Sequence, residues 1–378
     1  MRPASDAERA RLNDTFAALC RIASPFGHEQ ECSERVQAEL RGMRIEAEED
    51  AAGNLLARVP GRGERSILLC AHLDTVDDGG IPIDPVIVDG GWENANDGIL
   101  GADNKAAVAV ILELARRCSV EGAPVGLELL FTTGEENALE GAKQFDASQL
   151  QSDFGYVFDH ATPIGEVVTA SPTYFRLAAE FHGHAAHAGI RPEAGRSAIL
   201  AAAQAIAHMP LGRIDEQTTA NVGSIQGGAG STNIVPERCS LLAETRSLDP
   251  SRVEDVVSGI VDAIHDGAAH AECDVDVVSE RLFIGYRQKP SAPAIVAAEA
   301  ALRACGYEPK RIVTGGGSDA NVLAAGGFTC VNLANGTERN HEPTERVSVA
   351  ALEGMLDVVL ALLDESAALP APEPPAAI

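Results

Sequence analysis

The sequence has no long apolar run and no paired cysteine motif. Its longest apolar run covers residues 106–112, whereas roughly 20 such residues are needed to cross a bilayer, so a transmembrane segment is excluded. The first 19 residues carry acidic and basic side chains and lack the apolar core of a signal peptide. The 8 cysteines occur singly, which favours free thiols in a reducing compartment. We therefore expect a cytoplasmic protein with no membrane partner.

Basic residues are scarce, with 29 Lys and Arg against 56 Asp and Glu and a formal net charge of -27. Such a chain repels a phosphate backbone, so nucleic acid is not an expected partner. The acidity suits a solvated surface, and it could also attract cationic substrates or metal ions. With 378 residues, of which 45% are hydrophobic, the chain is long enough for two or three globular domains.

Two patterns of strands and helices divide the chain. Residues 1–170 and 287–368 alternate short apolar strands with helices, which predicts an α/β catalytic domain with a mixed, mostly parallel sheet flanked by helices. Residues 171–286, including a strand expected over 232–246, have the order strand, helix, strand, strand, helix, strand. This order predicts an inserted, ferredoxin-like α+β domain. Residues 369–378 contain four prolines, so a disordered tail is expected.

Imidazole and carboxylate groups gather at the ends of the predicted strands and at one helix start. Open α/β sheets bind their ligands at such strand ends. Taken singly, a His-x-Asp segment is more often a hydrogen-bonded pair, and a Glu-Glu pair is usually a solvated helix start. Taken together, the groups indicate one shared site. They are His72 and Asp74, Asp103, Glu135 and Glu136, Asp159, and His341.

Four segments in this order carry a family resemblance: residues 71–76 (AHLDTV), 100–105 (LGADNK), 133–136 (TGEE) and 340–341 (NH). The sequence resembles the peptidase T-like branch of the superfamily of zinc aminopeptidases, carboxypeptidases and aminoacylases. The resemblance extends over residues 10–365 and includes the inserted domain, which that family uses to form homodimers. We therefore expect a homodimer through residues 171–286.

The resemblance implies a cofactor of two Zn²⁺ ions per subunit. One ion would be held by His72, Asp103 and Asp159. The other would be held by Asp103, Glu136 and His341, so that Asp103 bridges the pair. Histidine and carboxylate are the usual ligands of catalytic zinc, although Co²⁺ or Mn²⁺ would be accepted by similar ligands.

The remaining groups of the site have implied roles beside the metals. Asp74 is expected to orient the imidazole of His72. Glu135 is expected to be the general base that takes a proton from the attacking water and delivers it to the leaving amine; alternatively, it only shapes the surroundings of the ligands. The Asp103-Asn104 peptide bond is expected to be cis, and Asn104 departs from the second Asp that is usual in this family.

The inserted domain and a later glycine-rich loop at residues 315–317 also contain residues that match family positions. His187 matches a histidine that reaches the partner subunit's active site and stabilises the oxyanion; the alternative is a surface histidine. Asn233, Arg246, Gly315 and Gly316 match substrate-binding positions, and Arg246 is suited to clamp a substrate carboxylate. The alternative for these residues is a turn or a solvated surface.

The leading hypothesis is a dinuclear zinc hydrolase of short peptides, specifically a tripeptidase-like aminopeptidase. The presence of Asp159, where many carboxypeptidase and deacylase relatives are expected to carry Glu, favours it. An N-acyl amino acid deacylase or a dipeptidase of the same superfamily is the alternative. A catalytically silent metal-binding assembly protein is a third hypothesis, and Glu135 argues against it because zinc binding alone does not need that carboxylate.

Overall fold

The computed structural model describes residues 1–228 and 230–370, and the predicted disordered tail falls almost wholly outside them. The chain forms two compact units. Unit 1 contains Met1–Ala170, Arg287–Thr314 and the chain from Ser318 onward, and unit 2 contains Ser171–Tyr286 with Gly315–Gly317. Among the described residues, no helix has both the length and the apolar character needed to cross a membrane.

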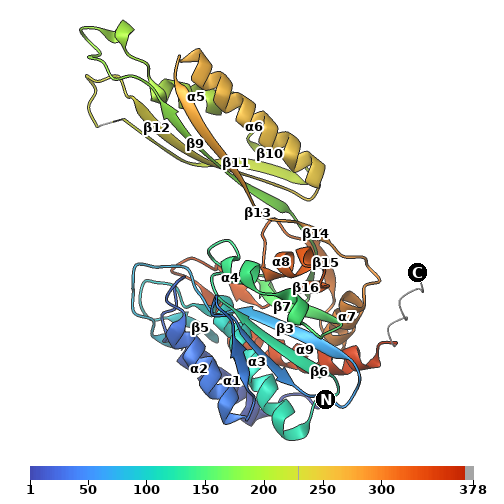
Figure 1. The fold of residues 1–378 in the computed structure, drawn as a ribbon. Helices are drawn as coiled ribbons and strands as arrows, with labels where there is room; N and C mark the ends of the chain where they lie inside the picture. Colours follow the sequence, from blue (N-terminus) through green and yellow to red (C-terminus); the bar gives the residue numbers. More distant parts are fainter. Residues whose placement is uncertain (229, 371–378) are drawn as a thin grey trace, which may run out of the picture. The chain divides into compact units, whose positions relative to one another are not determined.

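Unit 1 is built on a nine-stranded sheet with the order β1-β2-β6-β3-β7-β16-β8-β14, in which β15 pairs with β8 (Figure 1). Its centre, β6-β3-β7-β16, is parallel, and the neighbours β2 and β8 join this centre in antiparallel pairs. The predicted mixed α/β fold is thus confirmed. The strands are β1 (Ala47–Glu49), β2 (Leu55–Val59), β3 (Ser66–His72), β6 (Gly126–Thr132), β7 (Phe154–His160), β8 (Glu166–Ser171), β14 (Tyr286–Arg287), β15 (Lys310–Val313) and β16 (Cys330–Ala334).

Helices cover both faces of this sheet. Five of them contact one another in one layer, namely α1 (Asp6–Cys20), α2 (Gln30–Gly42), α3 (Ala102–Glu121), α7 (Pro293–Ala304) and α9 (Val349–Ala368). Alternate residues of β3, such as Ile67 and Leu69, join the core beneath this layer. On the opposite face, Cys70 of β3 points to α8 (Asp319–Ala325), which also packs against α4 (Glu140–Gln144).

A four-stranded sheet that the sequence analysis missed adds to unit 1. Its order is β17-β18-β5-β4, with the bounds β4 (Pro85–Val88), β5 (Gly91–Asn94), β17 (Thr337–Glu338) and β18 (Arg346–Ser348). Strands β4 and β5 are joined by Asp89 and Gly90, whose φ values are 48° and 74°. Two successive positive φ angles are typical of a type I′ hairpin turn, for which Asp-Gly is a favoured pair.

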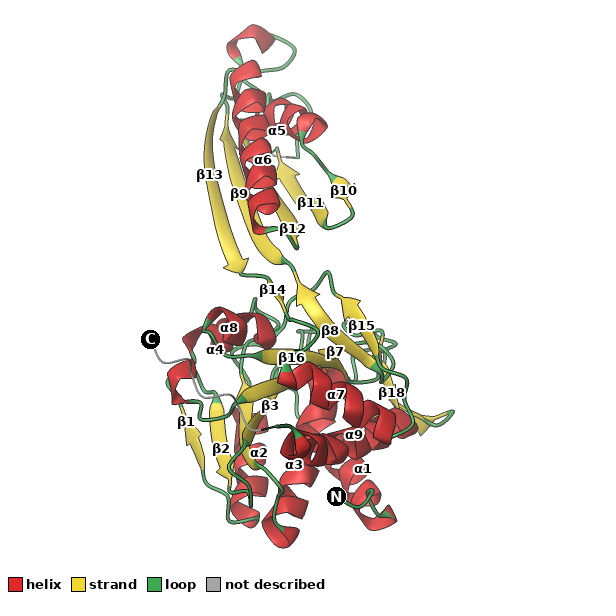
Figure 2. Ribbon diagram, turned by 90° about the vertical axis from the view of Figure 1, so that its right-hand side faces the viewer, coloured by secondary structure: helices red, strands yellow, loops and turns green. Residues whose placement is uncertain are grey.

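Unit 2 is a five-stranded antiparallel sheet with the order β10-β11-β12-β9-β13, and α5 and α6 cover one of its faces (Figure 2). Without β10, this is the strand order of the predicted ferredoxin-like domain, which is confirmed. The elements are β9 (Thr173–His182), α5 (Ala198–His208), β10 (Gly212–Asp215), β11 (Thr218–Gly227), β12 (Arg238–Ser247), α6 (Pro250–His270) and β13 (Asp274–Phe283).

One strand boundary in unit 2 was predicted wrongly. The strand expected over 232–246 begins at Arg238. Upstream, Asn233 and Val235 form main-chain hydrogen bonds with Ala188 and Ala186 instead. Pro236 has no N–H to donate to a strand ladder, so it separates the two segments.

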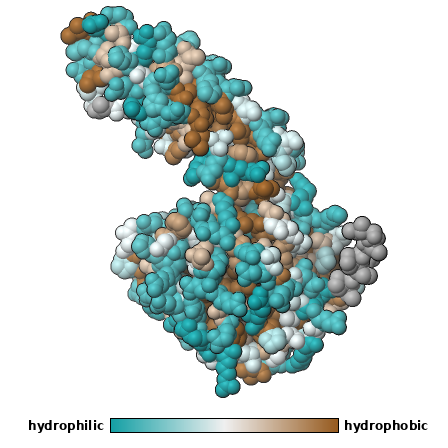
Figure 3. All heavy atoms as spheres, in the orientation of Figure 1, coloured by the Kyte–Doolittle hydropathy of each residue, from teal (hydrophilic) through white to brown (hydrophobic). Residues whose placement is uncertain are grey.

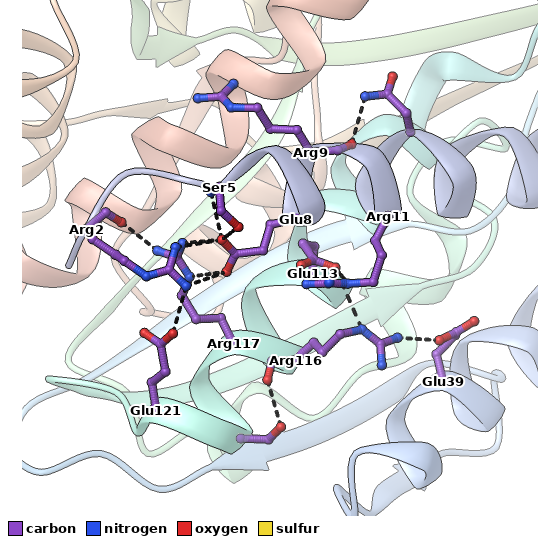
Figure 4. A network of polar contacts seen from close by, with 12 residues as sticks. Arg2, Ser5, Glu8, Arg9, Arg11, Glu39, Glu113, Arg116, Arg117 and Glu121 are labelled. Carbon is purple, nitrogen blue, oxygen red and sulfur yellow. Dashed lines mark hydrogen bonds and ion pairs between the residues drawn. The ribbon is translucent and has the colours of Figure 1, made fainter.

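A network of charged side chains ties α1 to α3 in unit 1 (Figure 4). The buried Glu8 accepts hydrogen bonds from Nε and Nη2 of the buried Arg117, at 2.6 and 2.8 Å. It also accepts one from the backbone N–H of Ser5 at 2.8 Å. The surface visible in Figure 3 is mostly hydrophilic, in keeping with the net charge of -27, and hydrophobic areas interrupt it.

We predict that Glu8→Ala lowers the free energy of unfolding by about 3 kcal/mol, because it leaves the buried Arg117 without its carboxylate. The bonds from Arg117 hold the pKa of Glu8 below its usual range. This stabilisation is therefore present above pH about 4.3, the pKa expected in the unfolded chain, and is lost as the pH falls further. Urea unfolding can be followed by fluorescence of Trp92, which donates from Nε1 to Asn13 of α1 at 2.8 Å.

The matched control is Glu121→Ala, which removes an exposed carboxylate that pairs with Arg2 at 2.8 Å. An exposed pair of this kind contributes about 1 kcal/mol or less. Equal effects of the two substitutions on the unfolding free energy would contradict the importance of the buried pair.

Candidate metal centre

The predicted site residues of unit 1 meet at the carboxyl ends of its central parallel strands. His72 is the last residue of β3, and Asp159 lies next to the end of β7. Glu135 and Glu136 follow β6 in the next loop. Because parallel strands end at the same edge of a sheet, residues from three distant parts of the sequence converge there.

Asp103 lies between two imidazoles. Its Oδ1 is 3.3 Å from Nε2 of His72, and its Oδ2 is 3.5 Å from Nε2 of His341. Nε2 of His341 is also 2.9 Å from Oε1 of Glu136, and Nε2 of His72 is 3.8 Å from Oδ1 of Asp159. The five side chains thus form two adjoining groups that share one carboxylate.

The chemistry of these atoms fits a cation. Nε2 of His72 and Oδ1 of Asp103 are buried and have no hydrogen-bond partner among the described residues. One ligand atom each from His72, Asp103 and Glu136 lies within 4.8 Å of the others, and the same holds for His72, Glu135 and Asp159. Imidazole and carboxylate atoms that converge in this way are donor types that divalent cations such as Zn²⁺ accept in proteins.

Asp74 has more contacts than the sequence analysis expected. Nδ1 of His72 is 3.0 Å from the main-chain oxygen of Asp74 and 3.4 Å from its Oδ1. The two carboxylate oxygens of Asp74 accept the backbone N–H groups of Glu135 and Glu136, at 3.0 and 2.9 Å. Asp74 therefore fixes both the imidazole of His72 and the start of the Glu135–Glu136 loop.

Burial dominates the electrostatics of the remaining carboxyl groups. Burial and then the charge of Asp159 raise the pKa of Glu135 well above its usual range. Burial and then the charge of Asp103 raise the pKa of Asp159 to about 7. Both shifts show that several negative charges share a poorly solvated space, and cations in the same space would lower these pKa values again.

Glu345 is a functional candidate that the sequence analysis missed. It is buried, and its carboxylate accepts the backbone N–H groups of Leu100, Gly101 and Asp103 at 2.9, 2.7 and 2.9 Å. The only signal in the sequence was its place four residues after His341. Glu345 therefore holds the turn before Asp103, although the two residues are far apart in the sequence.

Two further polar residues border the site. Asn340 donates from Nδ2 to Oδ2 of Asp103 at 2.7 Å. The buried Asp319 of α8 accepts a hydrogen bond from the hydroxyl of Thr132 at 2.5 Å. The peptide bond between Asp103 and Asn104 is cis, as predicted, and the Asn104 side chain is buried.

The other predicted site residues belong to unit 2, where they form two pairs of neighbouring segments. His187 and Asn233 are exposed and lie on neighbouring segments. An isolated antiparallel β-bridge pairs His187 with Ile234, and the N–H of Ala188 donates to the main-chain oxygen of Asn233 at 2.9 Å. Arg246 donates from Nη1 to the main-chain oxygen of Gly315 at 3.1 Å. Gly316, the next residue, accepts a hydrogen bond from the Ser171 hydroxyl at 2.8 Å.

Comparison with known proteins identifies both units. Residues 173–272 match the model of a peptidase dimerisation domain, and residues 54–163 match the model of peptidase family M28. The Bacillus subtilis protein YqjE is 35% identical over 367 residues, which are 94% of this chain and 98% of that protein.

Two solved structures resemble the whole chain. The aminopeptidase PepT from Bacillus cereus is 35% identical with a TM-score of 0.86, and the match covers 95% of this chain and 99% of that one. A tripeptidase from Staphylococcus aureus is 32% identical with a TM-score of 0.90, and the match covers 95% of this chain and 98% of that one.

We predict that Glu345→Gln weakens metal binding by roughly 10- to 100-fold, the usual cost of losing a residue that orients a ligand. An amide offers one acceptor oxygen, whereas the Glu345 carboxylate serves three N–H donors with two. Metal retained after dialysis against graded chelator concentrations measures the effect. Glu342→Gln, an exposed change in the same segment, should leave retention unaltered, and equal losses in both variants would refute the role of Glu345.

Proposed function

The chain belongs to the peptidase T-like branch of the M20 metallopeptidases, and we propose that it is a tripeptidase-like aminopeptidase with two divalent metal ions. The observation that carries the proposal is the position of Asp103, with one carboxylate oxygen toward each of His72 and His341. A carboxylate placed in this way is suited to bridge two cations. We expect both to be Zn²⁺, with Co²⁺ or Mn²⁺ as substitutes.

The proposed ligand sets are those expected from the sequence. His72, Asp103 and Asp159 would hold one ion, and Asp103, Glu136 and His341 would hold the other. Bound divalent cations supply Lewis-acid chemistry, polarising the scissile carbonyl and acidifying water beside them. Asp74 keeps the imidazole of His72 oriented through contacts of 3.0 and 3.4 Å to Nδ1.

Glu135 is the proposed general base. Its backbone is held by Asp74, and its carboxylate lies near His72 and Asp159, close enough to serve as a ligand as well. We assign proton transfer to Glu135 because Glu136 already pairs with His341 at 2.9 Å. In this assignment Glu135 takes a proton from the attacking water and gives it to the amine that leaves.

The substrate-binding roles in unit 2 are also part of the proposal. Arg246, with the loop at Gly315 and Gly316, would bind the carboxylate of a short peptide, and Asn233 would assist. His187 would stabilise the oxyanion in the active site of the partner subunit, in a homodimer formed through unit 2. Light scattering measures whether the protein is a dimer. The match to a peptidase dimerisation domain over 173–272 supports this assembly. We expect the enzyme in the cytoplasm.

The experiment that tests the activity is hydrolysis by the purified, metal-loaded protein of a panel of substrates. The panel contains tripeptides with free amino ends, dipeptides and N-acyl amino acids. Preference for tripeptides supports the proposal. Preference for dipeptides or N-acyl amino acids would select one of the alternative hydrolases, and no hydrolysis at all would support the silent assembly protein.

For the metal centre, we predict two divalent ions per chain in fully loaded protein. Asp103→Ala should remove both, because a bridging carboxylate belongs to both coordination spheres, whereas His72→Ala should mainly remove one. Elemental analysis after dialysis provides the count. A loaded wild-type protein with at most one ion per chain would rule out the dinuclear centre.

For the general base, we predict that Glu135→Gln keeps both metals while kcat falls roughly 10²- to 10⁴-fold or more. Glutamine preserves the size of the side chain but cannot accept the proton. Glu136→Gln is the matched comparison and should lose a metal as well as activity. Near-normal turnover by the Glu135 variant with both metals bound would show that another group accepts the proton.

A further inference from the structure

Three side chains form a row across the sheet of unit 2, on the face opposite its helices. Arg246 of β12 and Phe283 of β13 both stand in register with Tyr174 of β9. The Arg246 guanidinium lies 4.1 Å from the centroid of the Tyr174 ring. The rings of Tyr174 and Phe283 meet edge to face at 5.3 Å. The aromatic pair therefore supports one face of the guanidinium.

The glycine-rich loop at residues 315–317 contacts both ends of this row. Gly315 accepts the hydrogen bond from Nη1 of Arg246 at 3.1 Å. At the other end, a Cβ on Gly317 would lie only 2.3 Å from Cζ of Phe283, so this ring occupies the space that a side chain at Gly317 would need. The loop and the row thus constrain each other.

Glu244 occupies one edge of the same guanidinium. Nε and Nη2 of Arg246 each donate to the Glu244 carboxylate at 3.2 Å. A guanidinium has five N–H donors. Glu244 and Gly315 engage three of them, and the Tyr174 hydroxyl also interacts with this guanidinium. Both members of the ion pair are only half-buried, and an incoming carboxylate would have to compete with Glu244 for the positive charge.

We propose that Tyr174 and Phe283 are positioning residues that hold Arg246 for a free C-terminal carboxylate, and that Glu244 moderates its affinity. This inference rests on the proposed function, in which Arg246 binds the carboxylate of a short peptide, and adds to it the residues that set the orientation and affinity of Arg246. They act on peptides that end in a carboxylate and not on the same peptides ending in an amide. The aromatic support fixes the plane of the guanidinium, and the planar fork then meets the carboxylate with two parallel N–H bonds.

The experiment compares a tripeptide with its C-terminal amide on the metal-loaded, full-length protein. Tyr174→Leu should raise KM for the carboxylate form by roughly 2- to 30-fold, the range expected for loss of a cation–π contact. Its kcat, and KM for the amide, should change less than twofold. Tyr174→Phe keeps the ring and should restore the preference. The control Arg176→Ala removes an exposed cation from the same strand, paired with Glu280, and should leave the KM ratio unchanged.

Glu244→Gln provides a test of opposite sign that leaves both rings in place. Removing the competing charge should lower KM for the carboxylate form by roughly 1.5- to fivefold, the range of a half-exposed ion pair, without changing KM for the amide. If circular dichroism shows that Tyr174→Leu does not fold, the change in KM of Glu244→Gln is the test of the inference.

Several results would overturn the inference. They are equal changes in KM for both substrates in Tyr174→Leu, a Tyr174→Phe variant that behaves like Tyr174→Leu, or a Glu244→Gln variant with unaltered KM. Wild-type protein that cleaves the tripeptide and its amide equally well would overturn the inference and the carboxylate-binding role of Arg246, and would leave the proposed peptidase activity standing. Wild-type protein that cleaves neither would overturn both.

Discussion

The carboxylate of Asp103, shared between His72 and His341, is the contact on which the candidate metal centre of unit 1 depends. An aspartate can face two imidazoles only if its main chain is held firmly, because its side chain is short. Glu345 supplies that support through three backbone N–H groups around Asp103. The parallel strands then bring His72 and Asp159 to the same sheet edge.

Two kinds of buried carboxylate surround this contact. Asp74 and Glu345 accept backbone N–H groups with both oxygens. These donors lower the cost of the negative charge, although burial still raises the pKa of Glu345 to about 7. Glu135 and Asp159 have mainly other acidic groups and His72 around them, and burial raises their pKa. Burying an ionised carboxylate is costly unless it is paired. Cations would stabilise the ionised form of the second kind, and this is a physical reason that the arrangement suits divalent metal ions.

Features with a local or periodic signal could be predicted from the sequence. The strand–helix alternation predicted the mixed sheet, and the order of elements over 171–286 predicted the ferredoxin-like unit. The Asp89–Gly90 pair was also a readable signal for the β4–β5 hairpin, yet it was overlooked because the flanking strands are only four residues long.

The supporting residues had no such signal. Glu345 binds main-chain groups more than 240 positions away, and the hydrogen bond between Asp319 and Thr132 joins α8 to β6. A carboxylate that accepts backbone N–H groups looks, in the sequence, like any exposed acidic residue. The chemistry of a ligand can be recognised from its type and motif, whereas the group that positions it becomes visible only when the chain is folded.

The two units hold their candidate site residues by different kinds of contact. In unit 1 the key carboxylates are fixed through backbone N–H groups, which a substitution at the donor residue does not remove. In unit 2 Arg246 is fixed largely by the side chains of Tyr174 and Glu244, which single substitutions do remove. If Arg246 binds the peptide carboxylate as proposed, changes at Tyr174 or Glu244 would alter which peptide end is accepted while the Asp103 contact stays intact. Substrate preference could then diverge among relatives that keep the residues of the candidate metal centre.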